Sequence, residues 1–173
     1  MAKSTQGRHN TVQEVLRKSL STLGGFVQVE EAQWLQRRVA GGGRRERARA
    51  DISVRIGGRA YAIDVKCMDS TCPTYQGRSL NSVLQLGEDQ KHTAYSSFLP
   101  REVTLIAFVL DINGCLGQEA IRFVDLIHDI VKESHPLFRS YFRRNLSRAL
   151  AVVRANTINE FTCKVRGWRI HEN

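Results

Sequence analysis

Residues 51–67 have the sequence DISVRIGGRAYAIDVKC, two runs of β-prone side chains joined by the pair Gly57-Gly58. A glycine pair between two such runs is typical of a two-residue hairpin turn, because the turn needs backbone angles that glycine adopts without strain. With these glycines at the turn, Asp51 faces Asp64 across the hairpin. Strand alternation then places Lys66, two residues beyond Asp64, on the same face as both carboxylates.

This cluster of charges predicts a metal site. Like charges that face one another across a hairpin destabilise it unless something neutralises them. Two carboxylates suit an oxygen-seeking cation such as Mg²⁺ or Mn²⁺, which keeps several waters and takes further ligands from phosphate. A bound water becomes a better nucleophile, and Lys66 could orient it or stabilise developing charge. The alternatives are a solvated hairpin face and a structural Asp64–Lys66 pair.

The segments before the hairpin predict a helix, a short strand and a linker. Apolar side chains recur at helical spacing from Val12 to Leu23, Asn10 is the expected N-cap, and Gly24-Gly25 ends the helix. Residues 26–30 are expected to form a strand. Residues 37–49 hold six arginines and three consecutive glycines, which predicts a flexible linker.

The segments after the hairpin predict helices over residues 88–97, 118–132 and 137–155, with a break at Pro136. Residues 102–110 are expected to form a buried strand and residues 160–166 a short one. This order predicts an α/β or α+β fold in which helices flank a mixed central sheet. The length of 173 residues suits one domain that spans residues 1–173.

The formal net charge is +9, and it is distributed unevenly. Residues 1–50 carry ten Lys and Arg against four Asp and Glu, and residues 132–173 carry nine against three, whereas residues 51–131 carry seven against ten. Basic flanks around an acidic centre suit a protein that holds phosphates outside and cations inside, although a generally basic, solvated surface is the alternative. No apolar stretch approaches the length of a membrane span or signal peptide, so we expect an intracellular protein, nuclear if eukaryotic, with no membrane contact.

The residues around the hairpin resemble the PD-(D/E)xK nucleases. The pattern is Ala50-Asp51, a thirteen-residue step to Asp64, then Val65 and Lys66. It is most similar to the restriction-like endonuclease domains of site-specific non-LTR retrotransposons, and more distantly to archaeal Holliday-junction resolvases. The likeness extends over most of the chain, and further segments carry it: His9-Asn10, the helix with Lys91 and Tyr95, residues 114–120 (GCLGQEA) and residues 146–156 (LSRALAVVRAN).

The resemblance implies a restriction-endonuclease-like sheet and hydrolysis of phosphodiester bonds. Asp51 and Asp64 would be metal ligands, the main-chain carbonyl of Val65 a third ligand, and Lys66 the catalytic lysine. Ala50 replaces the usual proline, which affects backbone geometry and not chemistry. Asp64 replaces the commoner glutamate, which the motif permits.

Four further residues are candidates through the same resemblance. Lys91 and Tyr95, one helical turn apart, would contact phosphate beside the metal, with a plain surface pair as the alternative. An acidic residue of the first helix joins the metal site in related nucleases, which makes Glu14 a candidate, although the helical wheel places it opposite the apolar face. His9 lies on the inward row and could orient water or contact phosphate, or serve only in capping or packing.

DNA is the expected partner, as duplex or as a branched structure. Arg44, Arg45 and Arg47 of the linker would grip its backbone, or else belong to a solvated loop. The leading interpretation is an endonuclease domain that nicks target DNA for a mobile element. The alternatives are a resolvase, which cleaves four-way junctions as a homodimer, and a nucleic-acid-binding module that has the nuclease fold but does not cut.

Overall fold

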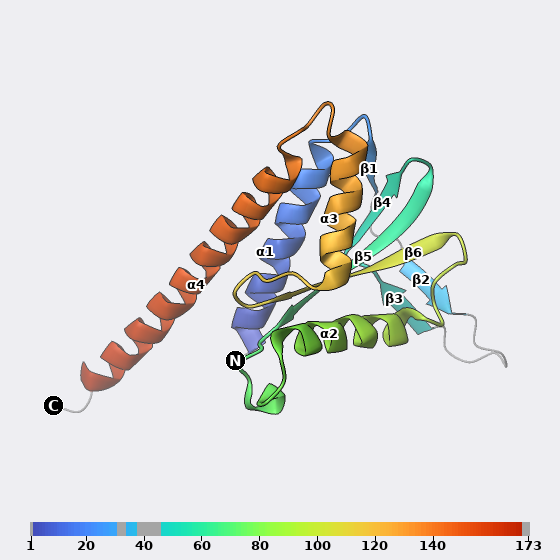
Figure 1. Cartoon of the computed structure of the whole chain (residues 1–173). Coiled ribbons are helices and arrows are strands. Elements are labelled where there is room, and N and C mark those ends of the chain that lie inside the picture. Colours follow the sequence, from blue (N-terminus) through green and yellow to red (C-terminus); the bar gives the residue numbers. More distant parts are fainter. Residues whose placement is uncertain (1, 31–33, 38–45, 171–173) are drawn as a thin grey trace.

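A four-stranded mixed sheet with helices on both faces forms the centre of the molecule (Figure 1). It is seen in a computed structural model that describes residues 2–30, 34–37 and 46–170. The strands of this sheet are β1 (Val27–Glu30), β4 (Ile52–Ile56), β5 (Arg59–Met68) and β6 (Val103–Asp111), in the order β1-β4-β5-β6. The helices are α1 (Ala2–Ser21), α2 (Leu80–Tyr95), α3 (Gln118–Val131) and α4 (Phe138–Ile170), and a short 3₁₀ turn covers Pro73–Tyr75.

The predicted hairpin is confirmed as β4 and β5. Gly57 and Gly58 have φ angles of 54° and 81°, the left-handed values that a tight hairpin turn requires and that glycine adopts without a Cβ clash. The antiparallel register is also as predicted, with Ile52 opposite Ile63 and Ile56 opposite Arg59. β1 pairs antiparallel with β4, whereas β6 pairs parallel with β5, so the sheet is mixed.

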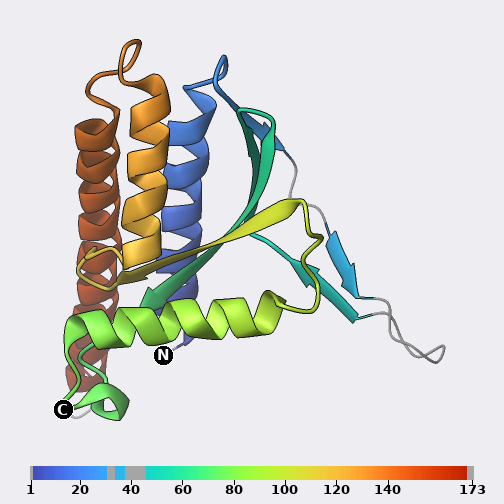
Figure 2. The same cartoon turned by 45° about the vertical axis from the view of Figure 1, so that its right-hand side comes forward.

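The two faces of β5 and β6 are covered by different helices (Figure 2). On one face, Ile63, Val65 and Phe108 join a large core with α1, α3 and α4. On the other face, Ala107 and Val109 pack under α2. Because side chains alternate along a strand, one row of β5 side chains faces this large core. The opposite row, which includes Asp64 and Lys66, faces α2.

The close approach of α2 to the sheet depends on Gly87. A Cβ at this position would lie 2.8 Å from Cγ1 of Val109, so a larger residue would force the Val109 side chain or its surroundings to shift. Glu88, buried next to it, accepts a hydrogen bond from the backbone N–H of Glu119 at 2.9 Å and so caps the first turn of α3. These contacts fix α2, the helix that carries Lys91, against β5 and β6.

Two predicted helix starts and one predicted strand are wrong. The first helix begins at Ala2, so Asn10 lies within it and is not its N-cap. α2 begins at Leu80, eight residues before the predicted start, with Ser79 as its N-cap. The strand predicted over residues 160–166 is absent because α4 continues as one helix to Ile170.

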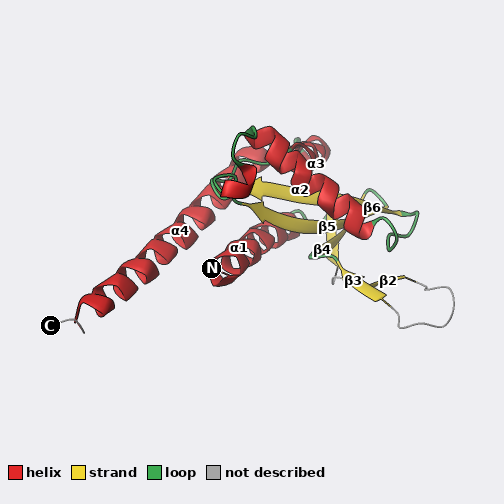
Figure 3. Ribbon diagram, turned by 90° about the horizontal axis from the view of Figure 1, so that it is seen from below, coloured by secondary structure: helices red, strands yellow, loops and turns green. Residues whose placement is uncertain are grey.

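Two strands lie outside the main sheet. β2 (Trp34–Arg37) and β3 (Glu46–Arg49) pair antiparallel as a separate ribbon beside the sheet (Figure 3). The predicted linker of residues 37–49 is therefore partly strand, and its residues 38–45 lie outside the described part of the chain. No helix within the described ranges is long and apolar enough to cross a membrane.

Candidate active site

The candidate site lies where the β4–β5 ladder ends. β4 begins at Ile52, whereas β5 continues to Met68, so residues 64–68 of β5 pair with β6 alone. The predicted ladder pair of Asp51 and Asp64 is not formed, because the last pair is Ile52 with Ile63. Asp51 instead turns its carboxylate to the open edge of β5, where its Oδ2 accepts the backbone N–H of Val65 at 2.7 Å.

The Val65 carbonyl also faces this edge. The N–H and C=O groups of one residue in a strand point to the same side, and the Val65 N–H points to Asp51. No β4 residue pairs with Val65, so the ladder of β4 and β5 does not use this carbonyl. The carbonyl oxygen, predicted as a third metal ligand, thus lies on the same edge of β5 as the Asp51 carboxylate.

Helix α1 fixes Asp51 from the core side of the sheet. His9 Nε2 lies 2.9 Å from Oδ2 of Asp51, and Gln13 donates a hydrogen bond to the Asp51 main-chain carbonyl at 2.8 Å. The hydrogen bond to Asp51 raises the pKa of His9 in spite of its partial burial. Burial by itself would raise the pKa of Asp51, but the hydrogen bonds from His9 and Val65 outweigh it and lower that pKa.

Asp64 has the opposite electrostatic character. Its side chain is only 6% exposed, and burial is the main cause that raises its pKa, with the neighbouring Asp51 carboxylate adding to the effect. Lys91 of α2 opposes the shift, since its ammonium lies 2.5 Å from Oδ2 of Asp64. Apart from this ion pair, Oδ2 is buried without a hydrogen bond of regular geometry. The site therefore holds one carboxyl group that ionises readily and one that resists ionisation.

Lys66 lies on the same side of β5 as Asp64, as predicted. It is half-buried, and its ammonium contacts Oε1 of Gln90 on α2. Burial lowers its pKa, and the nearby charge of Lys91 acts in the same direction. Two lysines and two carboxylates thus share a small region between β5, α1 and α2.

The structure brings some of the other candidates to this region and leaves others away from it. Tyr95 is close, but it is only 7% exposed and its hydroxyl donates to the main-chain carbonyl of Arg49 at 2.9 Å, which anchors the start of the hairpin. Glu14 is exposed and pairs with Lys18 at 3.1 Å. Arg44 and Arg45 lie outside the described residues, as does the side chain of Arg47.

The donors present fit a hard divalent cation. Within the described residues, no group of three or more His, Cys, Asp and Glu side chains could hold a metal. Mg²⁺ does not need such a group, because one or two carboxylates suffice when waters and substrate phosphates complete its shell. The buried Oδ2 of Asp64 lies 2.5 Å from the Lys91 ammonium, which shows that a positive charge is accommodated next to this oxygen.

Two residues of the site were not among the candidates predicted from the sequence. Gln13 and Gln90 hold the Asp51 main chain and the Lys66 side chain, respectively. Glutamine is common on helix surfaces, so its type gives no reason to select it. The one available signal for Gln13 is its spacing of four residues from His9, which puts both side chains on the same face of α1.

We expect the buried Asp64 carboxylate to destabilise the metal-free protein near neutral pH. Its pKa is raised from 3.8 to about 6, so the stability of the protonated form is fully present below pH of about 4 and is lost as the pH rises through about 6. Asp64→Asn should therefore raise the free energy of unfolding at pH 7 by about 1–2 kcal/mol, a value reduced from the full shift to allow for solvent screening. Urea unfolding in the presence of chelator at pH 4 and pH 7 measures it.

The matched control is Asp129→Asn, which replaces an exposed carboxylate on α3. Its effect on stability should be small. An Asp64→Asn protein that is no more stable than the wild type at pH 7 would contradict the electrostatic description of the site.

Comparison with known proteins adds no family to these observations: no protein-family model matches the chain, and no curated protein matches it either.

Proposed function

We propose that the protein is a metal-dependent DNA endonuclease with Asp51, Asp64 and Lys66 as its catalytic residues. The observation that carries the proposal is the pair of carboxylates at the open edge of β5, one with a lowered and one with a raised pKa, next to a half-buried lysine. Catalytic groups are commonly found where burial and neighbouring charges shift pKa values in opposite directions.

The metal would be held by the two carboxylates and the Val65 carbonyl. Bound there, Mg²⁺ or Mn²⁺ would lower the pKa of a water and neutralise charge on the phosphate. His9 and the Val65 N–H both bind Oδ2 of Asp51, so its other oxygen would be the one available to hold a cation. His9 is thus a positioning residue that orients a ligand, a role that histidines and carboxylates often share around metal sites.

Lys66 would supply the fixed positive charge of the reaction. Its ammonium stands on the Asp64 side of β5, and its contact with Gln90 restricts where it can move. A fixed cation stabilises negative charge that grows on the phosphate as water attacks, and it does so more strongly in a partly buried site than in water.

DNA is the substrate that the charge distribution favours. The basic flanks of the sequence and the arginine-rich segment that precedes Asp51 would attract the phosphate backbone. The resemblance to the nuclease domains of non-LTR retrotransposons supports a role in nicking the target of a mobile element. A junction resolvase and a binding module that does not cut are the outcomes against which the proposal is tested.

The decisive experiment incubates the full chain with supercoiled plasmid, linear duplex and a four-way junction. We expect nicked or linear products in Mg²⁺ or Mn²⁺ and none with chelator. Paired, symmetric incisions confined to the junction would identify a resolvase. DNA binding without cleavage of any substrate in either metal would overturn the proposal and support the alternative of a binding module that does not cut.

Lys91 adds a further prediction, because its ammonium occupies the place of a cation at Asp64. A metal must compete with it, so Lys91→Met should increase the affinity for Ca²⁺ or Mn²⁺ about threefold to tenfold in the absence of DNA. Titration calorimetry measures this directly. Lys132→Met, at the exposed end of α3, is the control and should leave the affinity unchanged.

The same variant should bind DNA more weakly once metal is present. Lys91, displaced from Asp64, would be free to contact a phosphate beside the metal, which agrees with the role implied by the resemblance. A Lys91→Met protein with unchanged or weaker metal affinity would show that Lys91 does not compete for the site.

A further inference from the structure

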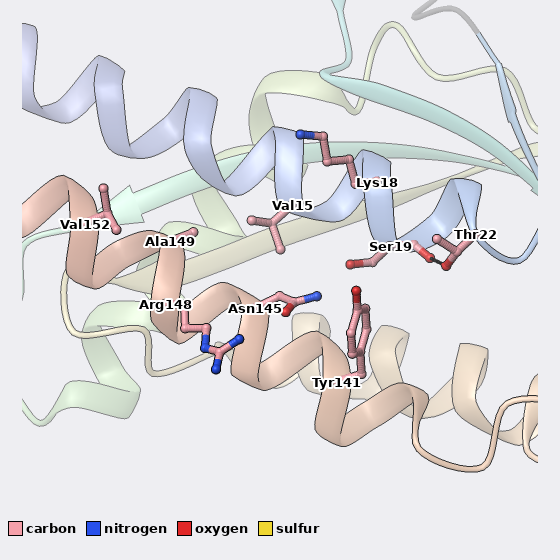
Figure 4. A pocket seen from close by; sticks show the side chains of 9 residues that line it. All are labelled: Val15, Lys18, Ser19, Thr22, Tyr141, Asn145, Arg148, Ala149 and Val152. Atoms are coloured by element: carbon pink, nitrogen blue, oxygen red, sulfur yellow. Dashed lines mark hydrogen bonds between the residues drawn. The ribbon is translucent and has the colours of Figure 1, made fainter.

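A second surface, separate from the candidate active site, runs along the contact of α1 and α4 (Figure 4). A groove of about 390 Å³ lies between the two helices. Its floor and walls include Val15, Ser19, Ala149 and Val152, and the ring of Tyr141 extends from α4 toward α1. None of the residues assigned to the candidate site lines it.

The groove continues past Tyr141 to the loop before α4. A second hollow of about 350 Å³ shares Thr22 and Tyr141 with the first and is lined further by Leu137 and Phe138. From its first residue, Phe138, to Val152, α4 rises by about 21 Å. The combined groove is therefore long enough for several turns of a partner helix.

Several large apolar side chains along the groove are exposed to solvent. Leu137 is 72% exposed, Val152 59% and Tyr141 46%, and all three lie along the same groove. Single exposed apolar residues are ordinary, but several in one groove with a polar rim are typical of an interaction surface. A partner that covers them must itself be apolar on one side.

The charged residues of the groove have one sign. Lys18 belongs to α1 and Arg148 to α4, the two helices that border the groove (Figure 4). Neither hollow is lined by Asp or Glu. Lys18 forms an ion pair with Glu14, whereas Arg148 forms no ion pair within the described residues. Arg144, whose guanidinium lies 5.6 Å from the centre of the Tyr141 ring, adds a further positive charge beside the groove.

We propose that this groove binds an acidic amphipathic helix of a partner protein. Apolar side chains at one-turn spacing would cover Leu137, Tyr141 and Val152, and flanking carboxylates would pair with Arg148 and its neighbours. Nucleic acid fits the groove less well, because a phosphate backbone gains little from exposed leucine and valine. A second copy of the chain fits less well too, since each copy has a formal charge of +9 and would repel the other.

The test uses the full chain and a synthetic helical peptide of about 20 residues with leucines along one face and glutamates beside them. Fluorescence anisotropy of the labelled peptide should show binding that Arg148→Glu weakens about tenfold or more. Val152→Glu should weaken it similarly. Arg143→Glu is the matched control, because Arg143 is exposed on α4 but lines a different hollow, toward α3.

A peptide with lysines in place of the glutamates should bind at least about tenfold more weakly, which is the signature of charge complementarity. Equal binding of both peptides, or no effect of Arg148→Glu, would overturn the proposal. It would also be overturned if Arg148→Glu impaired duplex-DNA binding and left the peptide unaffected. Concentration-dependent self-association that Val152→Glu abolishes, seen by sedimentation, would assign the groove to a second copy instead.

Discussion

Replacing Asp64 by asparagine is expected to abolish DNA cleavage in Mg²⁺, with a rate loss on the order of 10³-fold or more. Asparagine keeps the shape of the side chain but removes the charge that a divalent cation requires. Asp64 is buried, and its ion pair with Lys91 does not offset the cost of burying its charge, so the change should not unfold the protein. Loss of activity would therefore report on metal binding and not on unfolding.

Asp51→Asn should have an effect of similar size for a related reason. The amide can still accept the Val65 N–H but no longer binds a cation or a charged His9 with the same strength. The double variant should be no slower than either single variant, because both residues act on the same metal. Plasmid nicking measures the rate, and anisotropy with duplex DNA in the absence of divalent metal measures binding, which should change little.

Asp129→Asn, on the exposed surface of α3, should cleave at the rate of the wild type and exclude a general effect of lost negative charge. Cleavage by Asp64→Asn at the wild-type rate would refute the assignment. So would a loss of DNA affinity in proportion to the loss of rate, since that would make the carboxylates part of the DNA-binding surface.

The hairpin could be predicted because its turn and register follow from local rules. Only glycine adopts the positive φ angles of residues 57 and 58 without strain, and the turn position then fixes which residues face each other. The sequence could not reveal that β4 begins at Ile52. Because β4 begins there, the edge of β5 beyond Ile63 has no β4 partner. Asp51 therefore binds the Val65 N–H through its side chain and does not pair with Asp64 in the sheet.

The helix boundaries were predicted wrongly where the sequence has only a weak pattern of apolar and capping residues. The first residues of α1 are polar and lack a helical apolar period, and Asn10, which looks like a cap, accepts a hydrogen bond from Gln6 within the helix. In α4, the short strand predicted over residues 160–166 is replaced by a continuous helix. Within this helix Thr157 and Thr162 donate to the carbonyls four residues earlier, which satisfies both hydroxyls without an end to the helix.

The candidate site combined one predictable part and one that depends on tertiary structure. The face of β5 that holds Asp64 and Lys66 follows from alternation alone. The ion pair of Asp64 with Lys91 and the bond of Asp51 with His9 join positions 27 and 42 residues apart, and they depend on how α1 and α2 pack on opposite faces of the sheet. The resemblance implied a place for Lys91 beside the site but gave no indication that it pairs with Asp64.

The second large effect is expected at Lys66, which we predict to act in the transition state and not in substrate binding. Its charge lies beside Asp64 on the open edge of β5, where the scissile phosphate would approach. Lys66→Ala should slow the chemical step about 10²–10³-fold, the usual cost of losing one preorganised electrostatic donor. DNA affinity should barely change, because the stabilised charge develops only as the reaction proceeds.

Single-turnover cleavage at saturating enzyme measures the chemical step, and DNA affinity in Ca²⁺ measures binding. Lys66→Arg keeps the charge but replaces a compact ammonium by a planar, bulkier group in a partly buried place, so it should recover only part of the rate. Lys132→Ala, which removes an exposed positive charge at the end of α3, should leave both quantities unchanged. If Lys66→Ala lost affinity in proportion to rate, Lys66 would be a phosphate contact present already in the ground state, because a group that acts only on the transition state cannot weaken binding of the intact substrate.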